Sequence, residues 1–210
     1  MVNAADNCPD KGNPDQEDGD GDNKGDICDP CPEVANPGSQ GCPASIYAIK
    51  TGGVDLGAQV AVTAVVSAVV GPSFFLQVPQ AEQDPVQGAQ HSGIYVYMGS
   101  EEDPDVPTPS EGALIRLTGK ADEFYGQKQL NNVTEIEVLS DAGGAPGPVV
   151  IDDVESVMTG GSLADKYESV LVQVTGVVTA HNPPAGAGDK DPTHEFLLDG
   201  LRVNDLMYHP

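Results

Sequence analysis

The sequence predicts a mainly β protein that begins with an irregular, acidic segment. Gly and Pro are abundant, with 25 and 18 of the 210 residues, as expected for strands joined by many turns. From residue 46 onward, runs rich in Val, Ile, Tyr and Phe alternate with Gly- and Pro-containing turns. Helical patterning is confined to 152–158 and 162–168. The predicted strands are 46–49, 58–70, 73–78, 93–98, 112–120, 129–139, 169–180, 194–199 and 201–208.

The charge of the chain is strongly negative. Lys and Arg total 9 and Asp and Glu total 33, which gives a formal net charge of −24. Such a chain repels phosphate backbones, so binding to nucleic acid without bridging cations is disfavoured. No apolar run reaches membrane-spanning length, so no membrane span is expected.

Residues 1–33 are the most acidic part of the chain. Ten acidic residues against two lysines give this stretch a net charge of −8. With almost no apolar residues it cannot fold by hydrophobic burial, so it is either disordered or held by something else. Four cysteines in or beside it predict two disulfides and an oxidising compartment; zinc is the alternative, although only one pair has CxxC spacing. The cysteines are Cys8, Cys28, Cys31 and Cys42.

The most specific motif runs from Asp18 to Asp29. Its acids fall at loop positions 1, 3, 5, 9 and 12, as in EF-hand-type loops, where side chains at 1, 3 and 5, the carbonyl at 7 and an acid at 12 surround calcium. Carboxylates without His or thiolate ligands favour Ca²⁺. Asn23 stands at position 6, where the chain must turn sharply; Gly is usual there, and Asn is the next best residue for a positive φ. A solvated acidic linker is the alternative.

The surrounding sequence resembles a thrombospondin type 3 repeat over residues 6–33. Asp6-Asn7-Cys8-Pro9 and Asn13-Pro14-Asp15-Gln16 precede the calcium loop and complete the pattern. The resemblance implies calcium ions wrapped by aspartates, little regular secondary structure, and disulfides between sequential cysteines. The implied pairs are Cys8–Cys28 and Cys31–Cys42. Residues 29–43 look like a degenerate closing repeat without acids.

The same resemblance implies the ligands. One ion would be held by Asp18, Asp20, Asp22, the Lys24 carbonyl and Asp29. Asn13, Asp15 and Asp26 would serve a neighbouring ion, and Asp6 would close a preceding loop whose first acids are absent here. The chain begins without a basic n-region or an apolar h-region, although a secreted protein should carry a signal peptide. We therefore expect a mature fragment of a longer repeat array.

The β-rich part contains an internal repeat. A strand–turn–strand–strand unit occurs twice, and the first copy continues into two further strands at 112–119 and 124–130. A long first strand, a hairpin and five strands in all suit a small OB-type barrel, whereas the second copy stops after three strands. The predicted domains are 1–43, 44–140 and 141–210. The matching segments are Val60–Ala68 with Val172–Ala180, Phe74–Val78 with Glu195–Asp199, and Gly93–Tyr97 with Gly200–Asn204.

Residues 46–139 are similar to the OB-fold modules attached to bacterial secreted nucleases and other surface proteins. The similarity is carried by Val60–Ala68, Phe74–Gln77, Gly93–Tyr97, Leu117–Gly119 and Glu123–Gly126. Tyr167–Val172 and Asp199–Val203 resemble the module that follows in the same proteins.

No catalytic motif is present. The four histidines lack metal-site spacing, no Ser lies in GxSxG, and no Gly-rich loop precedes Lys-Ser/Thr, so we expect no enzymatic activity. The aromatic residues could form a base-stacking platform. The favoured interpretation is that alternate members fill the barrel and the others pack on the neighbouring unit. These aromatic residues are Phe74, Phe75, Tyr95, Tyr97, Phe124 and Tyr125.

Three functions fit the sequence. The first is a calcium-binding, extracellular structural or adhesive protein, whose partners are calcium and further copies of itself or other cell-surface proteins. The second is the accessory region of a secreted nuclease or phosphoesterase. The third is an OB module that binds DNA or a polysaccharide.

The second copy, with three predicted strands instead of five, bears on the hypothesis of a structural or adhesive protein. Its open sheet needs a cover, which could be further strands, the first copy, or a strand from another chain, as in a filament. The apolar residues in need of a cover are Val170, Val172, Val174 and Val177.

Overall fold

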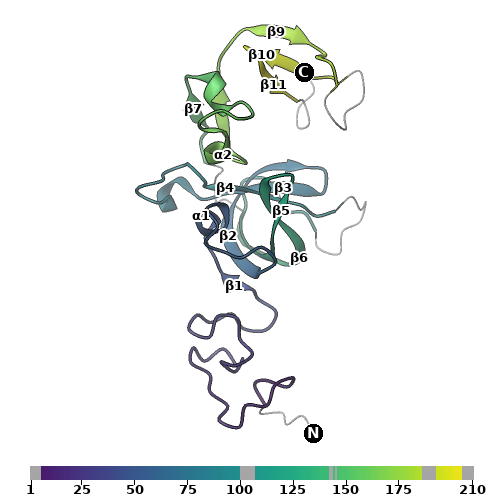
Figure 1. The fold of residues 1–210 in the computed structure, drawn as a ribbon. Helices are drawn as coiled ribbons and strands as arrows, with labels where there is room; N and C mark the ends of the chain where they lie inside the picture. Colours follow the sequence, from purple (N-terminus) through teal and green to yellow (C-terminus); the bar gives the residue numbers. More distant parts are fainter. Residues whose placement is uncertain (1–5, 100–106, 142–143, 145, 186–192, 205–210) are drawn as a thin grey trace.

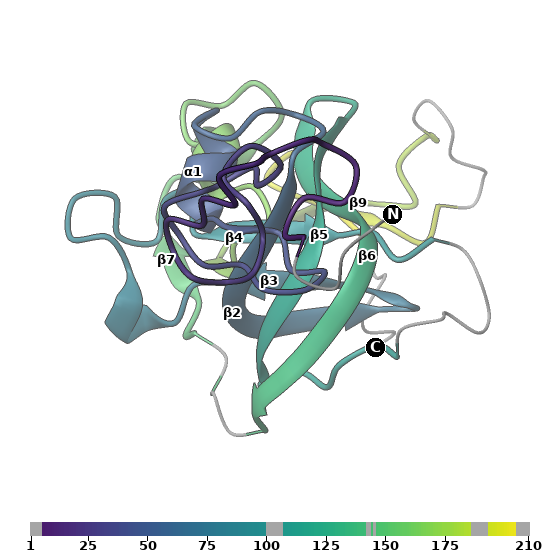
Figure 2. The same cartoon turned by 90° about the horizontal axis from the view of Figure 1, so that it is seen from below.

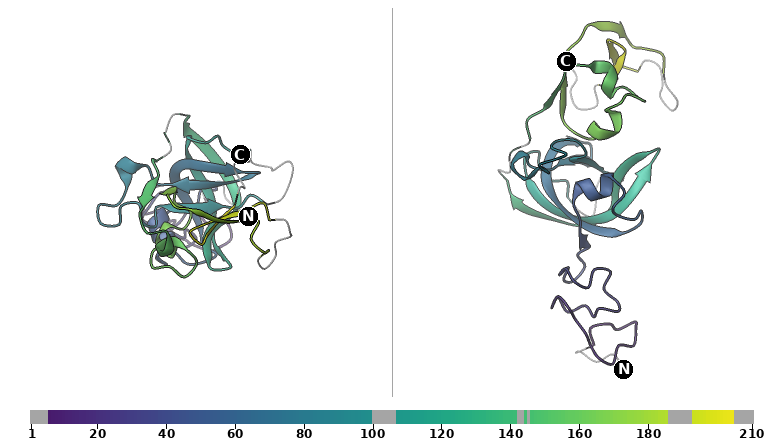
Figure 3. Two further views of the ribbon diagram at one scale, coloured as in Figure 1. Left: turned by 90° about the horizontal axis from the view of Figure 1, so that it is seen from above. Right: turned by 60° about the vertical axis from the view of Figure 1, so that its left-hand side comes forward.

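The computed structural model describes residues 6–99, 107–141, 144, 146–185 and 193–204. The protein is mainly β, as predicted, and is elongated (Figures 1 and 3). A five-stranded barrel forms its middle. The described part of the acidic segment, residues 6–43, extends from one end of the barrel, and the described part of the C-terminal unit, from residue 146 to residue 204, lies at the other end.

The barrel closes through strands that are far apart in the sequence. β2 pairs antiparallel with both β3 and β5, β3 pairs with β4, β4 pairs parallel with β6, and β6 returns to β5. This closed order, β2-β3-β4-β6-β5, confirms the OB-type barrel. The strands are β2 (Gln59–Val70), β3 (Ser73–Gln77), β4 (Gly93–Val96), β5 (Leu114–Phe124) and β6 (Gln127–Ser140), with the short helix η1 (Gln80–Glu82) between β3 and β4.

Alternation along the strands builds the core. On β3 and β4, the inward side chains of Phe74, Leu76, Ile94 and Val96 are fully buried, and Phe75 and Tyr95 between them are half-buried on the outer side. β2 is buried over most of its length because it pairs with β5 along its first half and with β3 along its second half. The fully buried side chains include Val62, Val66, Phe74, Leu76, Ile94, Val96, Ile115, Leu117 and Leu130.

One predicted strand is wrong: residues 46–49 form the helix α1 (Ile46–Lys50). Ser45 caps this helix by accepting a hydrogen bond from the Ala48 N–H at 3.1 Å. Ile46 and Ile49, three residues apart on one face, are 1 % and 2 % exposed and join the barrel core. The run is too short for the hydrophobic pattern alone to separate helix from strand.

The acidic segment has little regular structure, as expected from its composition. Its one strand among the described residues is β1 (Cys42–Pro43), which pairs in parallel with Val60 and Ala61 of β2. Both predicted disulfides are confirmed: Cys8–Cys28, with Cα atoms 5.8 Å apart, and Cys31–Cys42, with Cα atoms 5.9 Å apart. Figure 2 shows the segment from its free end, in purple in front of the barrel.

The C-terminal unit consists of two small sheets. β7 pairs in parallel with β8, and β9, β10 and β11 form an antiparallel sheet. The predicted helical stretches are confirmed as two short helices. The elements are β7 (Val149–Ile151), η2 (Val154–Val157), α2 (Ala164–Tyr167), β8 (Val172–Val174), β9 (Val178–His181), β10 (Phe196–Leu198) and β11 (Leu201–Val203).

The predicted continuous strand at 169–180 is wrong, because it is divided between β8 and β9. In the barrel, β5 pairs with residues 59–65 and so holds the first half of β2 straight. Within the described residues, no strand pairs with β8 as β5 pairs with β2, and the residues around Gly176, between β8 and β9, belong to no strand. The predicted strand at 201–208 is observed as far as Val203, and residues 205–210 lie outside the described residues.

The strand pairing confirms the internal repeat and corrects its alignment by one residue. Phe196 pairs with His181 and Val203, just as Phe74 pairs with Val69 and Val96. Phe74 therefore corresponds to Phe196, and not to Glu195 as the sequence alignment had it. Each copy also skips one residue at the equivalent bulge, Ser67 in β2 and Thr179 in β9.

The repeat extends further upstream than the sequence indicated. β7 pairs in parallel with β8 so that Val149 faces Val172, and β1 pairs in parallel with β2 so that Cys42 faces Val60. Val60 and Val172 are the aligned first residues of the two copies, and short helices follow β1 and β7 in each case. The C-terminal unit therefore repeats β1 to β4 of the barrel, and its described part contains no counterpart of the β5–β6 hairpin.

The C-terminal unit is bonded to the barrel through residues 166–171. The Leu171 N–H donates to Gln77 Oε1 at 3.0 Å, and the His91 N–H donates to the Lys166 carbonyl at 2.6 Å. Lys50 forms an ion pair with Glu168. Val170, one of the residues predicted to need a cover, is only 8 % exposed here. The barrel thus covers this part of the C-terminal unit.

Gly93 is expected to be essential for this junction. A Cβ atom at Gly93 would lie 2.0 Å from the Ser169 carbonyl oxygen, and backbone cannot move aside as a flexible side chain can. Gly93→Ala should therefore lower the free energy of unfolding by about 2–3 kcal/mol. It should also raise hydrogen exchange at 166–171. Gly147→Ala is the control, because no atom lies within 4 Å of the added Cβ. Equal stability of the two variants in urea unfolding would contradict the close approach.

Candidate functional site

The carboxylates of the predicted calcium loop converge. Ligand oxygens of Asp18, Asp20 and Asp22 lie within 4.8 Å of one another. Backbone N–H groups hold them in this arrangement. Asp18 Oδ1 accepts from Gly21 N at 2.8 Å and from Asp22 N at 3.2 Å, and Asp18 Oδ2 accepts from Asn23 N at 3.1 Å. The loop therefore fixes three carboxylates before any ion is added, and binding an ion needs little further ordering.

Two features of the loop bear on the sequence interpretation. Asn23 has φ +74°, so it makes the sharp turn that the motif requires at position 6. Asp29, the acid at position 12, is 8 % exposed, and its Oδ1 accepts from Cys31 N at 3.0 Å. The turn at Asn23 is therefore as the motif requires, whereas the carboxylate of Asp29 lies in a separate group with the sulfur atoms of Cys31 and Cys42.

The cluster contains unpartnered anionic oxygens. Within the described residues, Asp20 Oδ2 and Asp29 Oδ2 are buried and have no hydrogen-bond partner. Desolvation raises the pKa of Asp20, the backbone N–H of Asp22 opposes this, and the charges of Asp22, Asp29 and Asp18 raise it further. Buried carboxylate oxygens without partners are costly, and a cation held by Asp18, Asp20 and Asp22 would satisfy the Oδ2 atom of Asp20. An all-oxygen donor set of this kind fits a hard divalent cation such as Ca²⁺.

The other predicted ligands are placed differently. Asn13, 6 % exposed, donates to Asn7 Oδ1 at 2.6 Å and accepts from Gln16 Nε2 at 2.7 Å. Asp26 Oδ1 accepts from Gly19 N at 2.7 Å, and Asp6 Oδ1 accepts from Cys8 N at 3.1 Å. Asp15 is exposed. In the described residues these groups bond to their own loops, and a second ion at Asn13, Asp15 and Asp26 stays a prediction.

Asn36 was missed by the sequence interpretation. It is 2 % exposed, its N–H donates to Asp22 Oδ2 at 2.7 Å, and its own Oδ1 is buried without a partner in the described residues. The Lys24 ammonium donates to the carbonyls of Asn36 and Gln40. A signal was present in the sequence, because Asn36-Pro37 repeats the dipeptide Asn13-Pro14 and both asparagines are buried.

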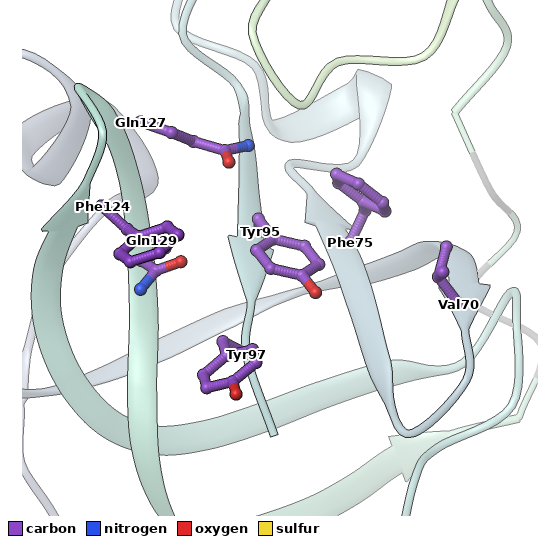
Figure 4. Close-up of a pocket in the computed structure, with 7 residues that line it drawn as sticks. All are labelled: Val70, Phe75, Tyr95, Tyr97, Phe124, Gln127 and Gln129. Carbon is purple, nitrogen blue, oxygen red and sulfur yellow. The ribbon is translucent and has the colours of Figure 1, made fainter. Parts of the chain in front are cut away.

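The aromatic residues divide between core and surface. Phe74 is fully buried in the barrel, in line with the favoured interpretation. Phe124 and Tyr125, at the tip of the β5–β6 hairpin, are 60 % and 96 % exposed, so the expectation that they pack on the neighbouring unit is wrong. The other aromatics face a pocket on the outside of the barrel (Figure 4). Its lining consists of Val70, Phe75, Tyr95, Tyr97, Phe124, Gln127 and Gln129.

The histidines do not form a site in the described part of the chain. His181 and His194 are exposed at the ends of one loop, as expected for surface residues. His91 is half-buried beside the C-terminal unit. Desolvation lowers its pKa, and the nearby ammonium groups of Lys50 and Lys166 lower it further, against the opposing effect of Asp165 and Glu168.

Comparisons with known proteins add little. No protein-family model and no curated protein matches the chain. Among solved structures, the hypothetical protein ygiW from E. coli is similar at 12 % identity and a TM-score of 0.32, over 47 % of this chain and 91 % of that chain. The S. pombe Stn1-Ten1 complex is similar at 16 % identity and a TM-score of 0.32, over 49 % of this chain and 80 % of that chain. The assignment of the barrel therefore rests on its strand order.

Helices in the described residues are short. None has the length and apolar character needed to cross a bilayer.

Proposed function

We propose that this chain is an extracellular, calcium-binding structural or adhesive protein without enzymatic activity. The observation that carries the proposal is the group of three aspartates, Asp18, Asp20 and Asp22, together with the buried Oδ2 of Asp20, which has no hydrogen-bond partner among the described residues. Two disulfides in the same segment support an oxidising, secreted location.

Calcium would act on the barrel through Asn36. The N–H of this residue bonds to the calcium-loop carboxylate of Asp22, and its Nδ2 donates to the Gln40 carbonyl at 3.1 Å. Cys42, two residues after Gln40, begins β1, which pairs with β2. A Cβ atom added at Gly41 would lie 2.5 Å from the backbone of Val60. The chain therefore packs closely against β2 at this residue. An ion that fixes Asp22 would therefore stiffen the whole segment against the barrel.

The C-terminal unit supports a role in assembly. It repeats the first half of the barrel, and within the described residues its strands β8 and β11 lack the partners that β5 and β6 give to β2 and β4. Apolar residues of this unit are exposed, with Val178 of β9 at 45 % and Val177, just before β9, at 68 %. Unpaired edges of this kind accept strands from other chains, and a head-to-tail contact of this type need not close.

Light scattering coupled to size-exclusion chromatography tests the assembly. The mass should rise with protein concentration, and calcium should increase this effect by stiffening the acidic segment. Val177→Lys should keep the protein monomeric, because a charge on the open edge opposes strand addition. Val86→Lys, at a site that is 91 % exposed in the barrel unit, is the control and should assemble normally. A wild-type monomer at the highest soluble concentration, with and without calcium, would reject assembly.

A further inference from the structure

The pocket on the outside of the barrel is lined by residues from all five barrel strands. Phe75 comes from β3, Tyr95 and Tyr97 come from β4 and the residue after it, and Phe124 and the two glutamines flank the turn of the β5–β6 hairpin. The space between them has a volume of about 450 Å³. In Figure 4 the rings of Phe75, Tyr95 and Tyr97 and the amide of Gln129 surround the same hollow. This volume suits a small-molecule or chain-segment ligand.

The aromatic side chains that line the pocket, Phe75, Tyr95, Tyr97 and Phe124, form its aromatic wall and are not explained by the barrel core. On β3 and β4 the inward residues Phe74, Leu76 and Ile94 are fully buried, so Phe75 and Tyr95 occupy outward positions where polar residues would suffice. The rings of Phe75 and Tyr95 lie 5.0 Å apart at an angle of 46°. They stand on directly paired residues and form a fixed surface. Grouped and exposed apolar side chains on a monomer usually mark a binding site.

Amide groups supply the polar edge of the pocket. Gln129 is 5 % exposed, and its Nε2 donates to Asp122 Oδ2 at 3.1 Å. Asn131 Nδ2 donates to the same oxygen at 2.7 Å. Gln127 Nε2 donates to Ser169 Oγ at 3.3 Å, which ties the pocket rim to the C-terminal unit. These contacts hold the amides in place, and each Gln presents an acceptor oxygen as well as donors.

The charge around the pocket selects the class of ligand. None of the seven lining residues is charged, and the ammonium of Lys128, which lies between Gln127 and Gln129 in the sequence, is paired with Glu123. Residues 34–210 carry 23 acidic and seven basic residues, a net charge of −16. A single-stranded nucleic acid needs a positively charged groove beside its stacking rings, and an anionic polysaccharide meets the same repulsion. An anionic ligand is therefore disfavoured, and the rings and amides suit a ligand with flat apolar faces and hydrogen-bonding groups.

We infer that this pocket binds neutral oligosaccharides. The C–H faces of pyranose rings pack on aromatic side chains, and their hydroxyl groups pair with amides that donate and accept. The inference extends the proposed adhesive role and rests on it only for its biological setting. The binding itself depends on the barrel unit, to which every residue of the pocket belongs. Calcium enters neither the aromatic wall nor the amide edge.

Titration calorimetry with defined probes tests the inference. The probes are cellohexaose, laminarihexaose and mannohexaose, with hexagalacturonate and a 15-nucleotide poly-dT strand as charged counterparts. At least one neutral hexasaccharide should bind, and the two charged probes should bind more weakly. Tyr95→Ala and Phe124→Ala should each weaken that binding about tenfold, as expected for one lost aromatic contact. Val86→Ala, on an exposed side chain that does not line the pocket, should leave the affinity unchanged.

Three results would overturn the inference. They are no binding of any neutral hexasaccharide at millimolar concentration, binding that survives both aromatic variants, and tighter binding of poly-dT that the same variants abolish. Unchanged thermal unfolding of Phe124→Ala, a change at an exposed side chain, shows that lost binding is not lost folding. The titration is repeated in excess chelator, where the affinity should not change. Failure of the calcium proposal would thus leave this result intact, and failure here would leave the calcium proposal intact.

Discussion

Removal of calcium is expected to raise amide hydrogen exchange throughout residues 6–36 while the barrel stays protected. Ten acidic residues in the first 33 repel one another, and among the described residues the segment has no helix and almost no strand to resist them. The two disulfides keep the loops tethered but do not neutralise the carboxylates. Because a bound ion does both, its loss should convert slow exchange into exchange close to that of an unfolded chain.

Asp20→Ala should have the same effect in the presence of calcium. Asp20 lies at the centre of the group, and its unpartnered Oδ2 is one of the oxygens that a cation would satisfy. We expect a loss of calcium affinity of about 100-fold or more, measured by calorimetry. Asp10→Ala is the matched control, since it removes one negative charge at an exposed position outside the calcium loop. Equal losses in the two variants would mean that calcium responds to net charge and not to a site.

The barrel strands could be predicted because their side-chain pattern is local. The apolar runs of β2, β3 and β4 are visible in consecutive residues of the sequence. Helix α1 could not be distinguished from a strand, because five residues with Ile at both ends of the buried face fit either period. Its capping Ser45 is the feature that separates the two, and one cap alone is a weak signal.

Other errors came from pairing, which a sequence does not show directly. The alignment of Phe74 with Glu195 was one residue off, because both strands contain similar apolar residues. Only the pairing of Phe74 with Val69 and of Phe196 with His181 fixes the register. The break near Gly176 depends on a partner strand and not on local preference. In the acidic segment, the convergence of Asp18, Asp20 and Asp22 was predictable from their spacing, whereas Asn36 bonds to Asp22 across a sequence separation of 14 residues.

The junction between the barrel and the C-terminal unit should depend on the ion pair of Lys50 with Glu168. The Lys50 side chain is 2 % exposed and that of Glu168 is 27 % exposed, so removing the carboxylate leaves a buried ammonium without its partner. We expect Glu168→Ala to lower the free energy of unfolding by roughly 2–4 kcal/mol, somewhat less than for a fully buried pair because Glu168 is partly solvated. Urea unfolding measures this change, and hydrogen exchange at 166–171 shows where it acts.

Two further variants separate charge burial from simple loss of contact. Lys50→Met combined with Glu168→Leu removes both charges and should recover most of the stability, because two well-packed apolar side chains can replace a buried pair. Glu123→Ala breaks the more exposed pair with Lys128 and should change stability by at most about 1 kcal/mol.

The pKa of His91 gives an independent measurement by NMR. The Glu168 carboxylate raises this pKa against the lowering by desolvation and by Lys50, so Glu168→Ala should lower it further. A double variant as unstable as Glu168→Ala, with an unchanged His91 pKa, would show that the carboxylate holds the two units together through its shape and not through its charge.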